Sequence, residues 1–261
     1  MDEGISLVAH KVNGIHYGAK HMKNIFYCHV PKCGGTSIAL SILNAFKLVK
    51  NKGAFHIQTK ASGRAAEITG ENMMHCREIL VAYELAMRRN KYGWGHSYCR
   101  PGLVDAFKAE WDFITLLRNP VDRWISEYFY NRDKTKSNWK KHDLSIDEYL
   151  NTEKAIKSGR EYISYFAEDS GSDSIIDDSK VERAVNNLKN FKIVGMLEDL
   201  AGWKTRFKDL YKIELDIEIL NASPNDEGVK EIKSDANYMK KIANLCEYDI
   251  TVYNAIKYQT D

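Results

Sequence analysis

The stretch that most constrains the fold is NIFYCHVPKCGGTSIALSILNAF, residues 24–46. Its apolar segment from Ile25 to Val30 is typical of a buried strand. A turn with the paired glycines Gly34 and Gly35 follows, and a helical pattern begins at Thr36. Free backbone N–H groups and the positive end of the helix dipole converge at such a helix start. The sequence therefore predicts an anion site at this turn.

The side chains of the turn fit a phosphate-like ligand. Lys32 supplies a compact positive charge, Thr36 and Ser37 supply hydroxyl groups, and glycines allow a close backbone approach. In the usual nucleotide loop, G-x-x-x-x-G-K-[ST], the lysine follows the glycines, whereas here it precedes them. A lysine in an ordinary surface turn is the alternative interpretation.

A second informative stretch is WDFITLLRNPVDRWISEYFY, residues 111–130. The near-continuous apolar run from Asp112 to Leu117 is typical of a strand buried in a parallel sheet. Arg118 ends this strand, Asn119 is a good N-cap, and Pro120 suits the first helical position. An arginine at a strand end beside a helix start predicts a second anion site.

The remaining chain alternates helical and strand patterns. Residues 47–71 are rich in Lys, Gly, Ser and Thr and are expected to form a loop that lines a site. Helices are predicted at 72–90, 101–107, 146–157, 180–190, 199–211 and 235–257, and further strands at 92–98, 191–196 and 217–220. This alternation predicts an α/β fold, a single three-layer domain over residues 24–261 with a central parallel sheet, preceded by an arm at 1–23. Ligands in such folds bind at the carboxyl ends of strands, where both anion sites fall.

Composition narrows the functional classes. The chain has 261 residues, 44% of them hydrophobic, and a formal net charge of +2, which is too small to indicate a nucleic-acid partner. No apolar run approaches the length of a membrane span, and no signal sequence is evident, so we expect a cytoplasmic protein that binds no membrane. The five cysteines lack metal-site or disulfide spacing, so reduced thiols and no metal centre are expected.

Both informative stretches resemble a known family. HVPKCGGTSI resembles the 5'-phosphosulfate-binding loop of sulfotransferases that use 3'-phosphoadenosine 5'-phosphosulfate (PAPS), especially the carbohydrate 2-O- and 6-O-sulfotransferase branch. LLRNPVDRWISEY is similar to that family's 3'-phosphate motif, in which a serine follows the strand-end arginine by eight residues. Weaker likenesses are VGMLEDL, LNASP and YDITVYNAI. The resemblance implies a P-loop-like sulfotransferase fold, PAPS as donor, the bisphosphate PAP as product, and no metal.

The resemblance also implies roles for individual residues. Lys32 would be catalytic, neutralising the charge that grows on the leaving phosphate. Arg118 and Ser126 would hold the 3'-phosphate. The complete implied cofactor-binding set is Lys32, Cys33, Gly34, Gly35, Thr36, Ser37, Arg118 and Ser126. Cys33 stands where many relatives have Thr, and Asn119 where many have Asp. A thiol at a helix start is expected to have a lowered pKa, but no Cys/His/Asp arrangement supports covalent catalysis.

An acceptor hydroxyl must lose its proton, so a general base is needed. In the carbohydrate branch a histidine between the two phosphate motifs has this role, which implies His96 in GHSY as the catalytic base here. A purely structural His96 is the alternative interpretation. His29 precedes the loop on the first strand, where a structural role is commoner, and His56 and Glu67 are reserves.

The acceptor is less constrained by the sequence. A basic run at 132–141 suits an anionic sugar chain, whereas an acidic run at 168–178 suits a cationic small molecule, and either run can be a solvated loop. We expect a small hydroxylated metabolite or natural product, such as a guanidinium alkaloid, ahead of a carbohydrate or glycolipid. Sulfation of an amine remains open. Rival functions are a nucleotide kinase, which needs a Mg²⁺-binding carboxylate, and a PAP-binding module without activity.

Overall fold

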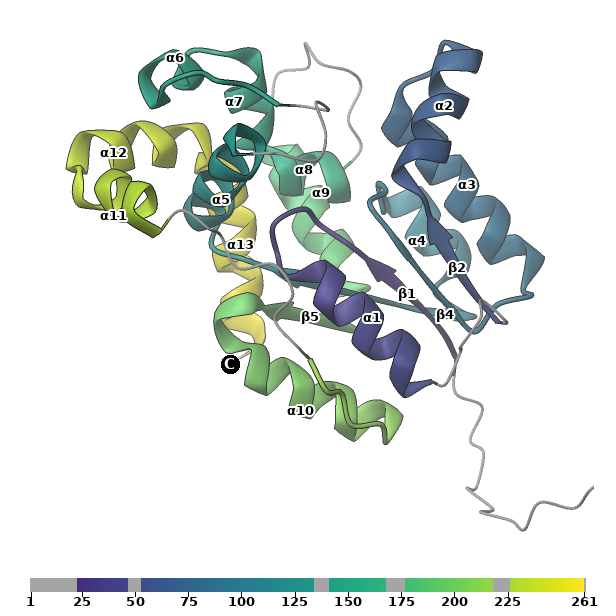
Figure 1. Cartoon of the computed structure of the whole chain (residues 1–261). Helices are drawn as coiled ribbons and strands as arrows, with labels where there is room; N and C mark the ends of the chain where they lie inside the picture. Colours follow the sequence, from purple (N-terminus) through teal and green to yellow (C-terminus); the bar gives the residue numbers. More distant parts are fainter. Residues whose placement is uncertain (1–22, 47–52, 134–140, 168–176, 218–225, 261) are drawn as a thin grey trace, which may run out of the picture.

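The described residues form a sheet of five parallel strands in the order β2-β3-β1-β4-β5 (Figure 1). The computed structural model describes residues 23–46, 53–133, 141–167, 177–217 and 226–260. The strands are β1 (Asn24–Cys28), β2 (Ala54–Ile57), β3 (Tyr92–Gly95), β4 (Trp111–Leu117) and β5 (Ile193–Met196). The predicted single α/β domain with a central parallel sheet is confirmed. The predicted arm at 1–23 lies almost wholly outside the described residues and stays a prediction.

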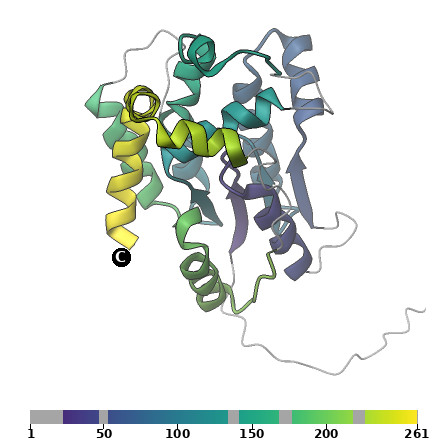
Figure 2. The same ribbon diagram turned by 60° about the vertical axis from the view of Figure 1, so that its left-hand side comes forward.

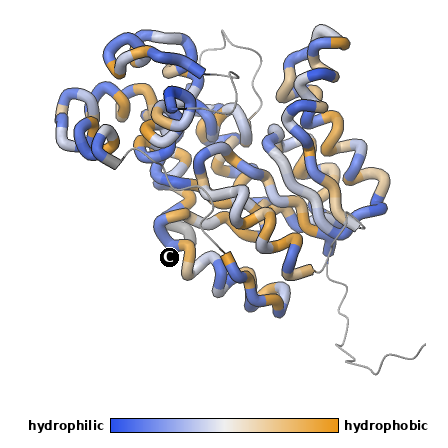
Figure 3. The backbone as a smooth tube through the Cα atoms, in the orientation of Figure 1, coloured by the Kyte–Doolittle hydropathy of each residue, from blue (hydrophilic) through white to orange (hydrophobic). Residues whose placement is uncertain are grey.

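Helices cover both faces of the sheet, because alternate residues of each buried strand point to opposite sides. Ile25 and Tyr27 of β1 face a core shared with α1 (Gly35–Ala45) and α10 (Leu200–Tyr211). Phe26 and Cys28 face the opposite core. That core is completed by α3 (Met73–Met87), α4 (Pro101–Phe107), α8 (Glu161–Phe166), α9 (Asp178–Lys189) and α13 (Glu247–Thr260). Figure 2 shows helices on either side of the sheet. Figure 3 colours each residue by its hydropathy, and many of the hydrophobic residues, in orange, lie in these layers.

A third group of helices lies beyond the carboxyl end of β4. Trp124 and Tyr128 of α5 (Pro120–Arg132) are its buried centre. The other helices that pack there are α6 (Ile146–Leu150), α7 (Glu153–Ser158), α11 (Asp226–Ser234) and α12 (Ala236–Leu245) (Figure 1). The predicted N-cap of α5 is confirmed, since the Asn119 side chain accepts from the Val121 and Asp122 amides.

The expectation of a loop at 47–71 is wrong in the described part of that range. Residues 54–57 form the edge strand β2, and Thr59–Thr69 form α2. The edge strand buries only its two end residues, and α2 buries only Ser62 and Ala66. Neither element therefore has the apolar periodicity by which sequence patterns are recognised.

Two predicted helices are each divided in two. The 146–157 helix stops at Asn151, and the Thr152 hydroxyl caps a new helix by accepting from the Ala155 amide. The 235–257 helix is interrupted at the buried Cys246. The strand predicted at 217–220 and most of the basic and acidic runs lie outside the described residues.

Candidate active site

Three predicted site residues follow three adjacent strands of the sheet. His96 comes directly after β3, Lys32 lies in the turn after β1, and Arg118 comes directly after β4. From β1 the chain proceeds to β2 on one side, whereas from β4 it proceeds to β5 on the other. In open α/β sheets, ligands bind at the carboxyl ends of the strands where this direction reverses. Lys32 and Arg118 therefore lie at the switch point of the sheet.

The turn after β1 has the geometry of an anion-binding nest. Lys32 and Gly34 both have left-handed backbones, with φ of 65° and 74°. The helix α1 starts at Gly35, and it has neither a side-chain cap nor an acidic residue in its first turn. Alternation of left-handed and right-handed residues turns successive N–H groups towards one point. The loop can thus hold the negatively charged group that the sequence predicts.

The second glycine of the pair is required by packing as well. A Cβ atom on Gly35 would lie 1.9 Å from Cδ2 of the His29 ring, far inside van der Waals contact. Gly34 has a positive φ, which other residues rarely adopt, and a Cβ there would also lie only 3.1 Å from Cδ1 of Leu197. Both glycines let the loop lie close to its neighbours, as well as to a ligand.

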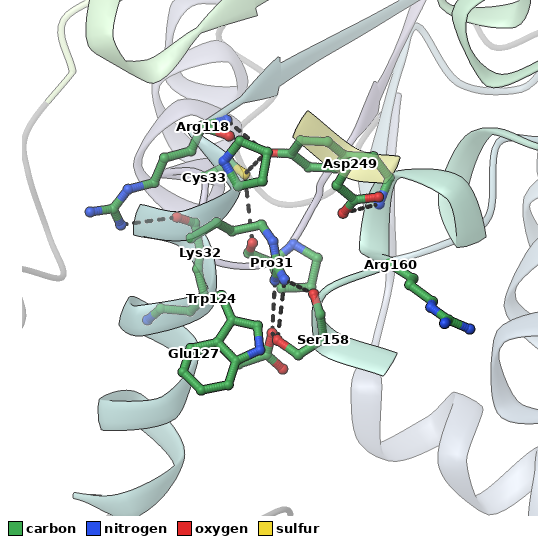
Figure 4. Close-up of polar contacts among 12 residues, drawn as sticks. Pro31, Lys32, Cys33, Arg118, Trp124, Glu127, Ser158, Arg160 and Asp249 are labelled. Carbon is green, nitrogen blue, oxygen red and sulfur yellow. Dashed lines mark hydrogen bonds and ion pairs between the residues drawn. The ribbon is translucent and has the colours of Figure 1, made fainter. Parts of the chain in front are cut away.

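The two predicted anion sites are in direct contact. Nη1 of Arg118 donates to the main-chain oxygen of Lys32 at 3.4 Å, as Figure 4 shows. The Lys32 ammonium group lies 3.8 Å from the ring centroid of Tyr130, an exposed residue of α5. This cation–π contact holds the lysine on the α5 side of the loop. The sequence analysis did not identify Tyr130, because an exposed helical tyrosine gives no distinguishing signal.

Ser126 is less firmly connected to the site. It is a half-buried residue of α5, and no hydrogen bond joins it to Arg118 in the described part of the chain. On the same helical face, Asp122 forms an ion pair with Lys233 of α11 at 2.6 Å. The shared binding of one phosphate by Arg118 and Ser126 therefore stays a prediction.

Cys33 is a buried structural residue. Its Sγ atom lies 3.6 Å from the main-chain oxygen of Pro31 and 3.7 Å from the Tyr162 hydroxyl. Burial raises the pKa of this thiol to about 12. The expected lowering of the pKa by the helix start is wrong, because loss of hydration on burial outweighs the nearby arginines and the Tyr162 hydroxyl, which lower it. The thiol is unsuited to nucleophilic attack at neutral pH.

His96 is half-buried, and its ring is held in one orientation. Its Nδ1 atom lies 2.8 Å from the main-chain oxygen of His29, and the two rings have centroids 3.9 Å apart. Burial, and next the proximity of His96, hold the pKa of His29 well below its ordinary value. Arg77 of α3 donates to the main-chain oxygen of His96 at 3.3 Å. His29 and Arg77 thus support the strand end that carries His96.

The reserve residues have other contacts. His56 is exposed on the edge strand β2, where its ring stacks on Trp94 at 4.7 Å between centroids. Glu67 belongs to α2 and forms an exposed ion pair with Arg64 at 3.3 Å. His56 is also close enough to His29, the residue directly after β1, to help lower its pKa.

A buried polar network under the site was missed by the sequence analysis. The fully buried Arg123 donates to Glu127 at 2.8 Å and to both the main-chain and hydroxyl oxygens of Ser158 (Figure 4). Nearby, the buried Tyr162 contacts Cys33 and Arg118, and the buried Asp249 binds the first turn of α8. These residues come from distant parts of the chain, so local patterns do not connect them.

Among the described residues, no group of three or more His, Cys, Asp or Glu side chains is arranged to hold a metal ion. No helix in those same residues combines the length and the apolar character needed to cross a membrane.

Comparison with known proteins assigns the family. A search of curated proteins finds no significant match. The mouse sulfotransferase SULT7A1, in a crystal structure with PAP, is 14% identical with a TM-score of 0.39, and the match covers 85% of this chain. This chain spans 63% of the length of that mouse chain. A sulfotransferase from Alicyclobacillus acidocaldarius is 15% identical with a TM-score of 0.39, over 87% of this chain and 96% of its own. The sequence profile of the sulfotransferase family matches residues 16–259, and the chain therefore belongs to the sulfotransferase family.

Proposed function

We propose that the protein transfers a sulfuryl group from PAPS to a hydroxyl group. The observation that carries the proposal is the convergence of Lys32, Arg118 and His96 at the carboxyl ends of three adjacent strands. A sulfuryl transfer needs charge stabilisation at the leaving phosphate, recognition of the nucleotide, and a base for the acceptor. These three residues have the chemistry for these three tasks.

The donor set at the β1 turn fits a nucleotide with a sulfated 5'-phosphate. The nest, the start of α1 and the Lys32 ammonium group present only positive ends to a ligand. Bound PAPS would supply the sulfuryl group and a phosphate leaving group. Lys32 would offset the negative charge that grows on that phosphate, and Arg118 would bind the 3'-phosphate that ATP lacks.

His96 is proposed as the general base of the reaction. Because its Nδ1 atom faces a carbonyl oxygen, the neutral ring carries its proton there and its acceptor lone pair on Nε2. Nε2 would accept the proton of the acceptor hydroxyl as the oxygen attacks. The His29 oxygen would fix the tautomer throughout.

A small hydroxylated metabolite is the proposed acceptor, with an amine or a carbohydrate as the other classes to be tested. In the basic run, Arg132 is already engaged: its Nε donates to Asp133 at 3.0 Å, and its guanidinium lies over Phe129. This engagement weakens the case for a polyanionic chain at that position. A cytoplasmic location is part of the proposal and rests on the sequence alone.

Thermal shift with PAP, and with ATP plus magnesium, tests the nucleotide. Ligand at 100 times its Kd stabilises a protein by about 2.7 kcal/mol, so PAP should raise the Tm clearly and ATP should raise it less. A larger shift with magnesium ATP would support a kinase instead.

Release of PAP from PAPS then tests turnover. The assay should use a phenol, a hydroxylated guanidinium compound, an amine and a disaccharide as acceptors. PAP release with the first two and little with the disaccharide is expected. Tight PAP binding without turnover on any of them would support an inactive nucleotide-binding module.

A further inference from the structure

One buried hydroxyl group pairs with both main-chain groups of Arg118. The Arg118 amide donates to the Tyr162 Oη atom at 2.9 Å, and the Tyr162 O–H donates to the Arg118 carbonyl oxygen. A tyrosine hydroxyl has one hydrogen to donate and lone pairs that accept, so both bonds can form together. The hydroxyl thus completes the backbone hydrogen bonding of the residue at which β4 has ended.

Burial makes these two hydrogen bonds difficult to replace. Tyr162 is 0% exposed, and burial raises its pKa well above the ordinary value, so that the hydroxyl keeps its proton. Without the hydroxyl, the amide and the carbonyl oxygen of Arg118 would lose this shared partner at a part-buried position. A donor or acceptor that loses its only partner inside the protein destabilises the segment that carries it.

Tyr162 is itself fixed to the rest of the domain. Its main-chain amide donates to Oδ2 of the buried Asp249 at 2.9 Å, and the Ile163 amide donates to Oδ1 of the same carboxyl group at 3.2 Å. Asp249 belongs to α13, so the first turn of α8 is attached to a second helix. Figure 4 shows Asp249, Cys33 and Arg118 around this point.

The same hydroxyl also lies beside the phosphate loop. Its oxygen is 3.7 Å from Sγ of Cys33, while the Arg118 side chain reaches the Lys32 carbonyl oxygen. Tyr162 therefore contacts the two segments that follow β1 and β4. A change in its position would alter the placement of Arg118 relative to the loop.

We propose that Tyr162 is a positioning residue that holds Arg118 for recognition of the 3'-phosphate, and so sets the preference for PAP over nucleotides without that phosphate. This inference rests on the proposed function. Tyr162 itself touches no ligand in this scheme, because its hydroxyl is used by the Arg118 backbone. Its effect must appear as a change in nucleotide selectivity.

The test compares binding of PAP and 5'-AMP by calorimetry to wild type, Tyr162→Phe and Tyr165→Phe. Tyr165 is a matched control, because it lies on the same helix and is 2% exposed. In Tyr162→Phe the PAP affinity should fall about tenfold while the 5'-AMP affinity stays within about threefold. Tyr165→Phe should leave the ratio of the two affinities unchanged.

Several outcomes would overturn the inference. An unchanged ratio in Tyr162→Phe, or an equal loss of both ligands, would show that Tyr162 has no selective role. A wild-type protein that does not prefer PAP over 5'-AMP would instead contradict the proposed function. If Tyr162→Phe does not fold, hydrogen exchange of wild type without nucleotide decides: the Arg118 amide should be protected like the strand amides, and rapid exchange would overturn the inference.

Discussion

Nδ1 of His96 lies 2.8 Å from the main-chain oxygen of His29, so a hydrogen bond connects the ends of the adjacent strands β3 and β1. A carbonyl oxygen can only accept, so the neutral imidazole must carry its proton on Nδ1. The tautomer of His96 is therefore set by the backbone of the strand that leads into the Lys32 turn. The proposed base is therefore hydrogen-bonded to the segment that leads into the proposed phosphate loop.

His96→Ala should lower turnover by about 10²- to 10⁴-fold while PAP binding stays close to wild type, because a general base acts on the acceptor and not on the nucleotide. The measurements are PAP release with an accepted substrate and PAP affinity by calorimetry. His56→Ala is the companion variant. Loss of turnover in His56→Ala, with His96→Ala still active, would identify His56 as the base.

Lys32→Ala should lower turnover by about 10²- to 10³-fold, because the charge on the leaving phosphate loses its nearest cation. Lys32→Arg restores the charge but changes its shape and reach, so partial activity is expected. Lys208→Ala is a control for removal of a lysine. Lys208 is an exposed residue of α10, and it forms an ion pair at 3.3 Å with Glu214, which follows that helix. Near-normal turnover of Lys32→Ala, with the fold verified by circular dichroism, would refute the proposed role.

Arg118→Ala should weaken PAP binding by about 10- to 100-fold and leave 5'-AMP binding nearly unchanged, because charge-assisted bonds to one phosphate are lost. Arg64→Ala provides the control, since Arg64 is an exposed residue of α2 paired with its helical neighbour Glu67. Calorimetry with both nucleotides measures the effect. A parallel loss of both ligands would place Arg118 at the 5' end of the nucleotide.

Cys33 should resist alkylation in the folded protein at pH 8. Burial raises its pKa to about 12, so that only about one molecule in 10⁴ carries a thiolate at that pH, and the side chain is 0% exposed. Mass spectrometry of the Cys33 peptide after treatment with iodoacetamide, with and without denaturant, measures the difference. Rapid labelling of the folded protein would mean that the loop opens or that the thiol is activated.

Local sequence patterns were sufficient to predict the ends of β1 and β4 at the centre of the site. The turn with Lys32 and the cap at Asn119 are each encoded within a few residues, by glycines in one case and by an Asn-Pro pair in the other. The order of the strands was not encoded locally. It places His96 beside Lys32 and Arg118 although the residues are far apart in sequence.

The supporting residues could not be predicted, because their roles depend on long-range packing. Tyr162 and Arg118 are separated by 44 positions, and Tyr162 and Asp249 by 87. The sequence patterns predict no helix or strand at Tyr162, which lies between the predicted helices at 146–157 and 180–190. The pKa of Cys33 was predicted in the wrong direction for the same reason, since the thiol is buried in a core cluster with residues distant in sequence, Tyr162 among them.

The free energy of unfolding should fall as the pH rises, because the charged form of Asp249 is disfavoured by burial. Burial raises its pKa to about 7, from an ordinary value of 3.8. A group whose folded pKa is raised contributes stability that is fully present below the unfolded pKa and is lost as the pH rises through the folded one. The loss from this group between pH 4 and pH 8 is up to about 4 kcal/mol.

Asp249→Asn should therefore remove this pH-dependent loss. Its amide oxygen cannot serve both the Tyr162 and Ile163 amides as well as two carboxyl oxygens do, so the variant should be less stable than wild type at pH 4.5. The difference in Tm should then shrink or reverse by pH 8, because the wild type alone carries the buried charge. Asp209→Asn, at an exposed site on α10, should show a nearly constant difference. A constant difference for Asp249→Asn as well would mean that Asp249 has an ordinary pKa, because Arg123 and the Tyr162 and Ile163 amides offset the effect of burial.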